Sequence, residues 1–321
     1  MAVQLTVLGN LTIDEIVDKG SVHTAPGGSA YYVSRTAAYL GARVRLVSNI
    51  GRDYKEKTLR QLSSEGVDLR DVRTDTGHTT RFRLSYEQEV RELWLLERGR
   101  RLGPVRRVGR PDIIHLGPVF REVGAQHFKT SRARTKFLSA DVQGLLRATG
   151  RRGHVKLVKR NLRPLVSMCD LVKASEEEAS VATGCSDAIS ALRQLQGICA
   201  GFVLLTRGRR GLFIGVPPDV VYSVPRYPEN HVVDPTGAGD TMVASWLHTY
   251  LTTRNPLWAA CVGSAFASLI LEKSGPRKFP VSRSELLKRS GFVYRRSRIV
   301  VQRVSSTTLR NRQVSRQLTR S

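Results

Sequence analysis

The sequence predicts an α/β fold, in which a doubly wound and mostly parallel sheet is flanked by helices. From Pro111 onward, short apolar runs alternate with stretches of helical periodicity, as such a sheet requires. Residues 5–9 form a short apolar run closed by glycine, which is typical of a strand buried on both faces. With 321 residues, of which 40% are hydrophobic, the chain can form one large core.

The composition excludes several classes of protein. No apolar run approaches the ~20 residues that a membrane-spanning helix needs, which indicates a soluble globular protein. The N-terminus has no basic stretch before its first apolar run, so we expect a first strand rather than a signal peptide, and a cytoplasmic protein. The four cysteines form no Cys-x-x-Cys pair, and neither a zinc site nor a disulfide framework is predicted.

The charge is strongly basic, with 52 Lys and Arg against 27 Asp and Glu. A net charge of +25 raises nucleic acid or an anionic surface as a partner. No nucleic-acid motif is present, and we prefer a generally basic surface. Beyond about Arg295 the chain is polar, basic and without periodicity, so we expect a flexible tail over residues 296–321. A nucleic-acid-binding appendage is the alternative for this tail.

Two features follow the first predicted strand. Asp14 emerges beyond its carboxyl end, where open α/β sheets bind ligands, and could accept hydrogen bonds from substrate hydroxyls. A solvated loop carboxylate is the simpler interpretation. The glycine pair Gly27-Gly28 then enters a run of helical spacing that Gly41 closes. Residues 78–97 alternate and are rich in Thr, Arg and aromatic residues, which predicts strands of a small sheet.

The second half of the chain repeats the pattern of a strand followed by polar residues. Asp141 falls at the end of a predicted strand that starts at Phe137. Three glutamates ending at Glu178 open a predicted helix, where acids ordinarily interact with the helix dipole. Residues 202–214 indicate two strands joined by a turn that contains Gly208 and Gly211.

The heptapeptide Asp234–Asp240 is the most specific stretch. The small residues Gly237, Ala238 and Gly239 precede an apolar helical run, so backbone N–H groups could converge on an anion at a helix N-terminus. Asp240 stands at the helix start, where a carboxylate could take a proton from an alcohol that attacks a bound phosphate. A glycine-rich turn with Asp240 as the helix N-cap is the alternative.

The whole heptapeptide resembles the C-terminal signature of the ribokinase, or PfkB, family of small-molecule kinases. Residues 26–32 resemble the N-terminal signature, with Tyr32 in the position where asparagine is usual. The resemblance runs from about residue 3 to residue 290. It implies a ribokinase-like kinase domain over residues 1–295, with a small β-sheet lid whose strands lie within about 12–26 and 78–97.

The resemblance also implies ATP and Mg²⁺ as cofactors and the transfer of the γ-phosphoryl group to a substrate hydroxyl. Ser175 replaces the asparagine of the family's Asn-x-x-Glu segment, whose acid orients the magnesium shell. The roles implied are catalytic base for Asp240; anion hole for Gly237, Ala238 and Gly239; substrate binding for Asp14, Gly27, Gly28, Tyr32, Asp141 and Asp234; ATP binding for Thr206, Gly208 and Gly211; and magnesium binding for Glu178.

Three runs look most like myo-inositol kinases, namely residues 139–147, 173–178 and 275–279. A cyclic polyol offers hydroxyls to Asp14 and C–H faces to Tyr32, so the best acceptor is a sugar or cyclic polyol, with myo-inositol preferred. A nucleoside kinase, in which Tyr31 or Tyr32 stacks on a base, is the alternative within the family. A nucleic-acid-binding protein on a kinase fold is the alternative from another class. A homodimer is left open, and no membrane partner is expected.

Overall fold

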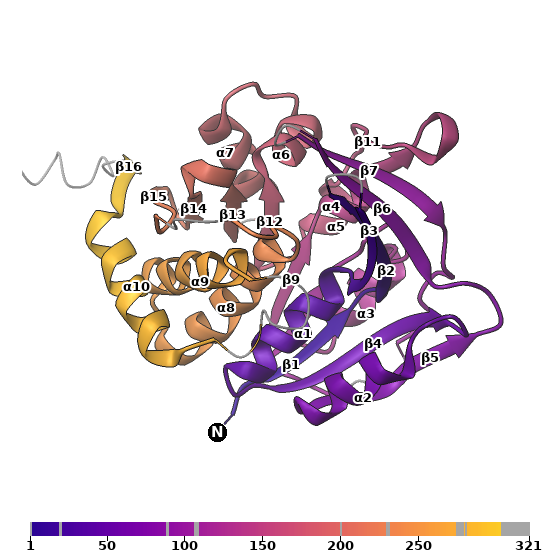
Figure 1. Ribbon diagram of the computed structural model, residues 1–321. Helices are drawn as coiled ribbons and strands as arrows, with labels where there is room; N and C mark the ends of the chain where they lie inside the picture. Colours follow the sequence, from indigo (N-terminus) through magenta and orange to yellow (C-terminus); the bar gives the residue numbers. More distant parts are fainter. Residues whose placement is uncertain are drawn as a thin grey trace, which may run out of the picture.

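The structure is a computed structural model that describes residues 2–18, 21–87, 90–105, 109–199, 201–228, 232–273, 279 and 281–302. Its centre is a ten-stranded sheet, drawn in Figure 1. From one edge to the other the strands are β16 (Arg298–Gln302), β15 (Val220–Val224), β14 (Leu212–Val216), β13 (Phe202–Thr206), β12 (Leu171–Ser175), β9 (Phe137–Asp141), β8 (Ile113–Leu116), β1 (Gln4–Leu8), β4 (Arg43–Gly51) and β5 (Val67–Asp75).

The strands from β5 to β13 pair in parallel, whereas β14, β15 and β16 complete the sheet with antiparallel pairs. The central strands β1, β8, β9 and β12 are buried almost throughout, as strands covered on both faces must be. The predicted doubly wound and mostly parallel sheet is therefore confirmed.

Helices cover both faces of this sheet (Figure 1). One face carries α1 (Ser29–Tyr39), α2 (Glu56–Ser64), α8 (Ala238–Thr253), α9 (Pro256–Leu271) and α10 (Arg283–Arg296). The other carries α3 (Ala125–Arg132), α4 (Gln143–Leu146), α5 (Arg163–Val166), α6 (Glu176–Thr183) and α7 (Ala188–Cys199). Each face has its own hydrophobic cluster, with Trp246 of α8 in the first and Phe128 of α3 in the second.

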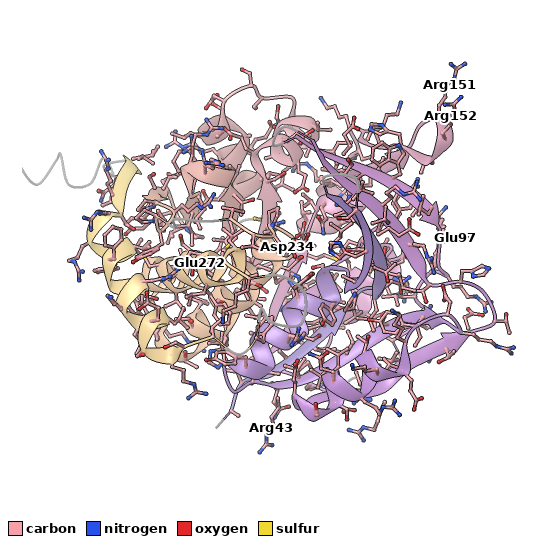
Figure 2. All side chains as sticks on the ribbon, in the orientation of Figure 1. Arg43, Glu97, Arg151, Arg152, Asp234 and Glu272 are labelled. Carbon is pink, nitrogen blue, oxygen red and sulfur yellow. The ribbon has the colours of Figure 1, made fainter. Side chains whose placement is uncertain are left out.

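A second, four-stranded sheet has the order β3 (Ser21–Gly27), β2 (Thr12–Asp18), β6 (Thr80–Glu87) and β7 (Val90–Glu97). Its strands fall in the two ranges that the sequence predicts for the lid. The short hairpin of β10 (Arg147–Thr149) and β11 (Val155–Leu157) joins β7 through a bridge between Trp94 and His154. Figure 2 shows Arg151 and Arg152 at the projecting tip of this hairpin.

The C-terminal segment differs from the predicted flexible tail. Helix α10 continues to Arg296, and residues 298–302 form β16, which pairs with β15 at the edge of the main sheet. The β-branched run Ile299-Val300-Val301 is typical of a strand, but the basic and polar residues around it hid this signal from an interpretation based on composition. Residues 303–321 lie outside the described residues, as do residues 275–278 of the third inositol-kinase-like run. Within the part of the chain that the structure describes, no helix is both long and apolar enough to span a bilayer.

Candidate active site

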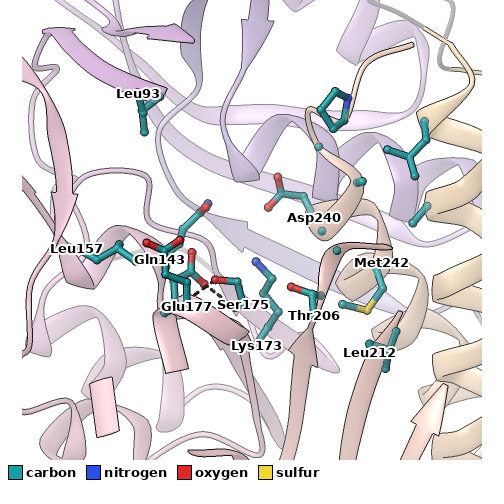
Figure 3. A pocket seen from close by; sticks show the side chains of 18 of the residues that line it. Leu93, Gln143, Leu157, Lys173, Ser175, Glu177, Thr206, Leu212, Asp240 and Met242 are labelled. Atoms are coloured by element: carbon teal, nitrogen blue, oxygen red, sulfur yellow. Dashed lines mark hydrogen bonds between the residues drawn. The ribbon is translucent and has the colours of Figure 1, made fainter. Parts of the chain in front are cut away.

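Two cavities meet at the N-terminus of α8. The larger, of about 880 Å³, extends from Asp240 to α9 and is bordered on its other side by β7 and β11, as Figure 3 shows from close by. The smaller, of about 50 Å³, lies between α8, the start of α1 and the small sheet. Five residues line both cavities and mark where they join: Leu93, Gln143, Arg147, Gly237 and Asp240.

Gly237 begins the loop at which the cavities join. It is the N-cap of α8 and adopts the left-handed conformation, with φ 81° and ψ 0°. A Cβ at this position would lie 2.3 Å from the ring of Tyr32, so both the backbone and the space demand glycine. The positive end of the α8 dipole therefore opens onto the cavities, as an anion-binding loop requires.

Asp240 lies in the first turn of α8, three residues after the N-cap. The alternative in which Asp240 itself caps the helix is therefore wrong, because Gly237 holds that position. Its carboxylate oxygen Oδ1 is buried and has no hydrogen-bond partner among the described residues. A buried oxygen of this kind is costly unless a ligand supplies a donor. Asp240 thus has the placement that a general base needs.

Asp14 lines the smaller cavity, although it belongs to β2 rather than to a loop after β1. Its side chain is buried, and its Oδ1 accepts a hydrogen bond of 2.7 Å from Thr12 Oγ1. A Cβ on Gly27 would lie 2.0 Å from Asp14 Oδ2, so the first glycine of the pair makes room for this carboxylate. Gly28, the N-cap of α1, also lines the smaller cavity.

Tyr32, from the N-terminal signature, packs against Gly237 of the C-terminal signature. It is buried in the wall of the smaller cavity, and its ring covers Gly237. Burial, together with the carboxylates of Asp234 and Asp14, raises the pKa of its hydroxyl well above the usual value, so the group stays protonated. The opposite wall is apolar and was not predicted; it comes from Phe82, Leu84, Leu93 and Val119.

Asp141 forms an ion pair with Lys173. It is fully buried, its Oδ1 accepts a hydrogen bond from Gln143 N at 2.9 Å, and its Oδ2 is 2.8 Å from the ammonium nitrogen of Lys173. Lys173 lines the larger cavity, whereas Asp141 lines neither cavity. The structure brings Asp141 to neither cavity, because its carboxylate is turned into the ion pair with Lys173, and its predicted contact with substrate stays a prediction. A lysine within the apolar strand β12 was the signal that sequence reasoning passed over.

Asp234 shapes the anion loop from outside the cavity walls. Its Oδ1 accepts a hydrogen bond of 2.9 Å from Thr236 N, which makes a local turn just before Gly237. Thr236 lines the smaller cavity, and Asp234 lies near the middle of the molecule in Figure 2. The geometry places Asp234 in the support of the loop, and its predicted contact with substrate stays a prediction.

Glu178 lies in the wall of the larger cavity at the start of α6. It forms a capping box with Ser175: Ser175 Oγ accepts from Glu178 N at 3.2 Å, and Glu178 Oε2 accepts from Ser175 N at 2.7 Å. Helix capping accounts for the serine at this position. The described residues contain no group of three or more His, Cys, Asp or Glu that could hold a metal ion. The magnesium role of Glu178 stays a prediction.

The far end of the larger cavity is built from the turn between β13 and β14 and from α9. Thr206, Gly208 and Gly211 all line it, as predicted residues of the ATP site should. Ser264, Ala267, Ser268 and Leu271 add the wall from α9. Because most of these side chains are small, they leave space beside the turn. No short sequence motif in α9 predicts this part of the cavity.

Arg147 is the buried cation on the border between the cavities, and the sequence did not single it out as functional. Its guanidinium donates to Val119 O at 2.9 Å and to Gln143 Oε1 at 3.1 Å. It also lies over the ring of Phe82, with 5.6 Å to the ring centroid. These contacts fix one edge of the group while Arg147 lines both cavities.

Known proteins resemble this chain in sequence. The cytidine kinase of Thermococcus kodakarensis is 29% identical over 284 residues, which cover 84% of this chain and 97% of the relative. The nucleoside kinase of Methanothermobacter thermautotrophicus is 25% identical over 279 residues, which cover 82% of this chain and 84% of the relative.

Solved structures share the fold. A pyrophosphate-dependent kinase in the ribokinase family, complexed with a pyrophosphate analog and myo-inositol, has a TM-score of 0.75 at 21% identity and covers 88% of this chain and 99% of its own. The nucleoside kinase of Burkholderia thailandensis, in complex with inosine, has a TM-score of 0.72 at 15% identity and covers 90% of this chain and 97% of its own.

The family described as pfkB family carbohydrate kinase matches residues 1–282. The relatives are kinases whose acceptors carry hydroxyl groups, so this chain is a phosphotransferase with an alcohol group as acceptor. Its coarse activity is that of a ribokinase-family sugar or nucleoside kinase. Since the match spans most of the 321 residues, the chain belongs to the pfkB family of carbohydrate kinases.

Proposed function

We propose that this protein transfers the γ-phosphoryl group of ATP to a hydroxyl of a sugar or cyclic polyol, with myo-inositol as the preferred acceptor. The observation that carries the proposal is the carboxylate of Asp240, which has a buried oxygen without a protein partner at the border of a large and a small cavity. A donor in the larger cavity and an acceptor in the smaller one would meet at this carboxylate.

The transfer is a single displacement at phosphorus. Asp240 takes the proton of the acceptor hydroxyl, and the oxygen forms a bond to the γ-phosphorus while the bond to the β,γ-bridging oxygen breaks. The products are a phosphate monoester and ADP. The backbone N–H groups of residues 237–239 and the dipole of α8 stabilise the charge on the transferred group, and the small sheet excludes water that would otherwise attack it.

The residues around the larger cavity suit a nucleoside triphosphate with its magnesium ion. Thr206, Gly208 and Gly211 border the part of the cavity beside α9 that would take the nucleoside, and Glu178 lines the same cavity, in which the phosphates would lie. Mg²⁺ with phosphates usually keeps several waters and needs only one or two carboxylates, which agrees with the lack of a dense acidic cluster among the described residues. When bound, it would neutralise charge on the phosphate oxygens.

The acceptor assignment rests on the contrast between the polar and the apolar groups of the smaller cavity. Asp14 and Tyr32 contribute polar groups to its lining, and Phe82 and Leu84 contribute apolar ones. A cyclic polyol matches both, because its hydroxyls can donate to Asp14 while its C–H groups pack on the apolar wall.

A nucleoside is the second candidate, because the cytidine kinase relative is 29% identical and 97% of its length is covered. In that case the ribose would lie at Asp14 and the base against Phe82 or Tyr32. The smaller cavity, of about 50 Å³, would have to open by movement of the small sheet before it could hold either a base or a cyclic polyol, so its volume does not distinguish the two acceptors.

A purified-protein screen tests the proposal. ADP formation would be measured with ATP and Mg²⁺ across inositols, hexoses, cytidine and adenosine, with Asp240→Asn as the matched blank and pyrophosphate as an alternative donor. The expected result is the highest kcat/KM for myo-inositol or a hexose with ATP. A nucleoside that is phosphorylated orders of magnitude better would contradict the polyol assignment and leave the role of Asp240 intact.

A further inference from the structure

We propose that the ammonium group of Lys173, which faces the first turn of α8, binds the transferred phosphoryl group of the donor, and that Asp141 positions it there. The inference rests on the proposed function, since it concerns the same anion site. It adds Lys173 as a further residue of that site, and Asp141 as a residue that acts through Lys173.

The geometry directs Lys173 at the anion loop. Lys173 of β12 and Asp141 of β9 are register partners on neighbouring parallel strands, and the ammonium nitrogen is 2.8 Å from Asp141 Oδ2. The side chain of Lys173 is only 7% exposed, yet it lines the larger cavity. A Cβ on Gly239 would lie 3.4 Å from this nitrogen, so the ammonium group faces the anion loop where glycine leaves the approach open. In Figure 3, Lys173 and Asp240 point toward the same part of the pocket.

The ammonium group has capacity left for a ligand. It carries three N–H donors in a tetrahedral arrangement, and among the described residues Asp141 is its one ion-pair partner. A phosphoryl oxygen placed between Lys173 and the first turn of α8 would then receive donors from two directions. This arrangement resembles a clamp on a group that gains negative charge during transfer.

A cation suits the electrostatics of the site. Asp141, Glu178 and Asp240 all interact with Lys173, and Glu178 and Asp240 line the larger cavity that a phosphate chain would enter. Burial alone would lower the pKa of Lys173, but these carboxylates outweigh burial and raise it, so the group remains charged at neutral pH. Burial and the charge of Lys173 lower the pKa of His115 to about 3, which leaves that neighbour neutral.

Asp141 would act only through Lys173. Buried and bonded to Gln143 N, it cannot reach a ligand in the cavity, but it holds the ammonium group against the end of β9. The competing interpretation is an ion pair with a purely structural role. Such a pair can often be replaced by neutral residues without loss of stability, whereas removal of one partner alone is strongly destabilising. The two interpretations therefore differ in what a double substitution does.

The test compares Lys173→Met, the double variant Lys173→Met with Asp141→Asn, and the matched control Arg132→Met. Arg132 is also paired with an aspartate, Asp170, next to β12, and it lines neither cavity. Thermal unfolding, turnover with ATP, and calorimetric affinities for Mg·ADP and for a non-hydrolysable Mg·ATP analogue would be measured for each protein.

The expected result separates folding from phosphoryl binding. Lys173→Met lowers kcat by about 100- to 1,000-fold, as loss of one donor to a transition-state oxyanion does. The same substitution lowers the affinity for the ATP analogue at least about tenfold. The affinity for ADP stays within about twofold of the wild-type value, because ADP lacks the group that Lys173 contacts. The double variant regains the melting temperature that the single variant loses but not its turnover. Arg132→Met changes the melting temperature and leaves turnover intact.

Two results would overturn the proposal. The first is a double variant that turns over at nearly the wild-type rate, which would make the pair structural. The second is an equal loss of affinity for ADP and for the ATP analogue, which would place Lys173 away from the transferred group. A wild-type protein that binds the analogue but phosphorylates no alcohol would contradict the proposed function alone, because the comparison of the two affinities still tests Lys173.

Discussion

The two cavities that meet at Asp240 are built from different parts of the chain's chemistry. The larger cavity, which we propose as the donor side, relies on backbone and small residues, and at Gly237 and Gly211 an added Cβ would clash with the surrounding atoms. The smaller cavity, which we propose as the acceptor side, relies on side chains, above all Asp14 and Tyr32. One side is therefore specified by positions where a side chain is forbidden, and the other by which side chain is present.

This difference explains why one side can be predicted from the sequence more easily than the other. A left-handed residue packed against Tyr32 admits glycine alone, so the donor loop leaves a fixed pattern in the sequence. The apolar wall of Phe82, Leu84 and Val119 admits many combinations of similar volume, and the acceptor has no comparable pattern. Substitutions on the two sides should accordingly have separable effects.

The largest effect is expected at the border itself. Asp240→Asn should lower kcat by ~10² or more while ATP affinity stays nearly unchanged, because the carboxylate acts on the acceptor proton. Steady-state kinetics and calorimetric ATP binding measure the two quantities separately. Turnover close to that of the wild type would remove Asp240 from the role of base.

Substitution of Asp14 should affect only the acceptor side. Asp14→Ala leaves substrate hydroxyls unpaired at a cost of ~1–3 kcal/mol, so the acceptor KM should rise about tenfold or more while the ATP KM hardly changes. The matched control is Glu15→Ala, because Glu15 is the next residue of β2 and pairs with Arg83 rather than lining a cavity. A rise in the ATP KM as large as that for the acceptor would break the division into two sides.

Gly237→Ala tests the link between the sides. It combines the cost of a left-handed residue, ~1–2 kcal/mol, with a clash against Tyr32 at 2.3 Å. Gly41→Ala is the matched control, since Gly41 has φ 96° and no atom within 4 Å of the added Cβ. Denaturant unfolding should show a similar loss of stability from backbone strain in both variants. Gly237→Ala alone should lose further stability and also have a lower kcat. Equal behaviour of the two variants would mean that the packing of Tyr32 on the loop has no consequence.

The smallest effect is expected for Tyr32→Phe, which keeps the ring over Gly237 and removes the hydroxyl. Loss of one hydrogen bond predicts a change of ~0.5–1.5 kcal/mol in acceptor kcat/KM, with stability and ATP KM nearly unchanged. Tyr31→Phe serves as the control, because the Tyr31 hydroxyl receives a hydrogen bond from Arg35 instead of facing the cavity. A larger fall in ATP affinity than in acceptor kcat/KM would place the Tyr32 hydroxyl on the donor side.

The fold class and the loop before α8 could be predicted because they depend on local patterns. Alternation of apolar runs with helical spacing predicted the parallel sheet, and the heptapeptide ending at Asp240 predicted the helix N-terminus. Long-range pairing decided the placement of two segments. Asp141 was expected in the substrate site but is buried against Lys173 of the neighbouring strand, and residues 298–302 of the predicted tail pair with β15 as an edge strand.

The sequence by itself indicated two local features: a glycine-rich loop directly before a helix, and a carboxylate at the start of that helix. These are properties of a few consecutive residues, so they can be recognised without the fold. Only the tertiary structure decided that Lys173 faces Gly239 and that Tyr32 covers Gly237. Both contacts join residues more than sixty positions apart, and their distances are set by the packing of whole strands and helices, which no local pattern encodes.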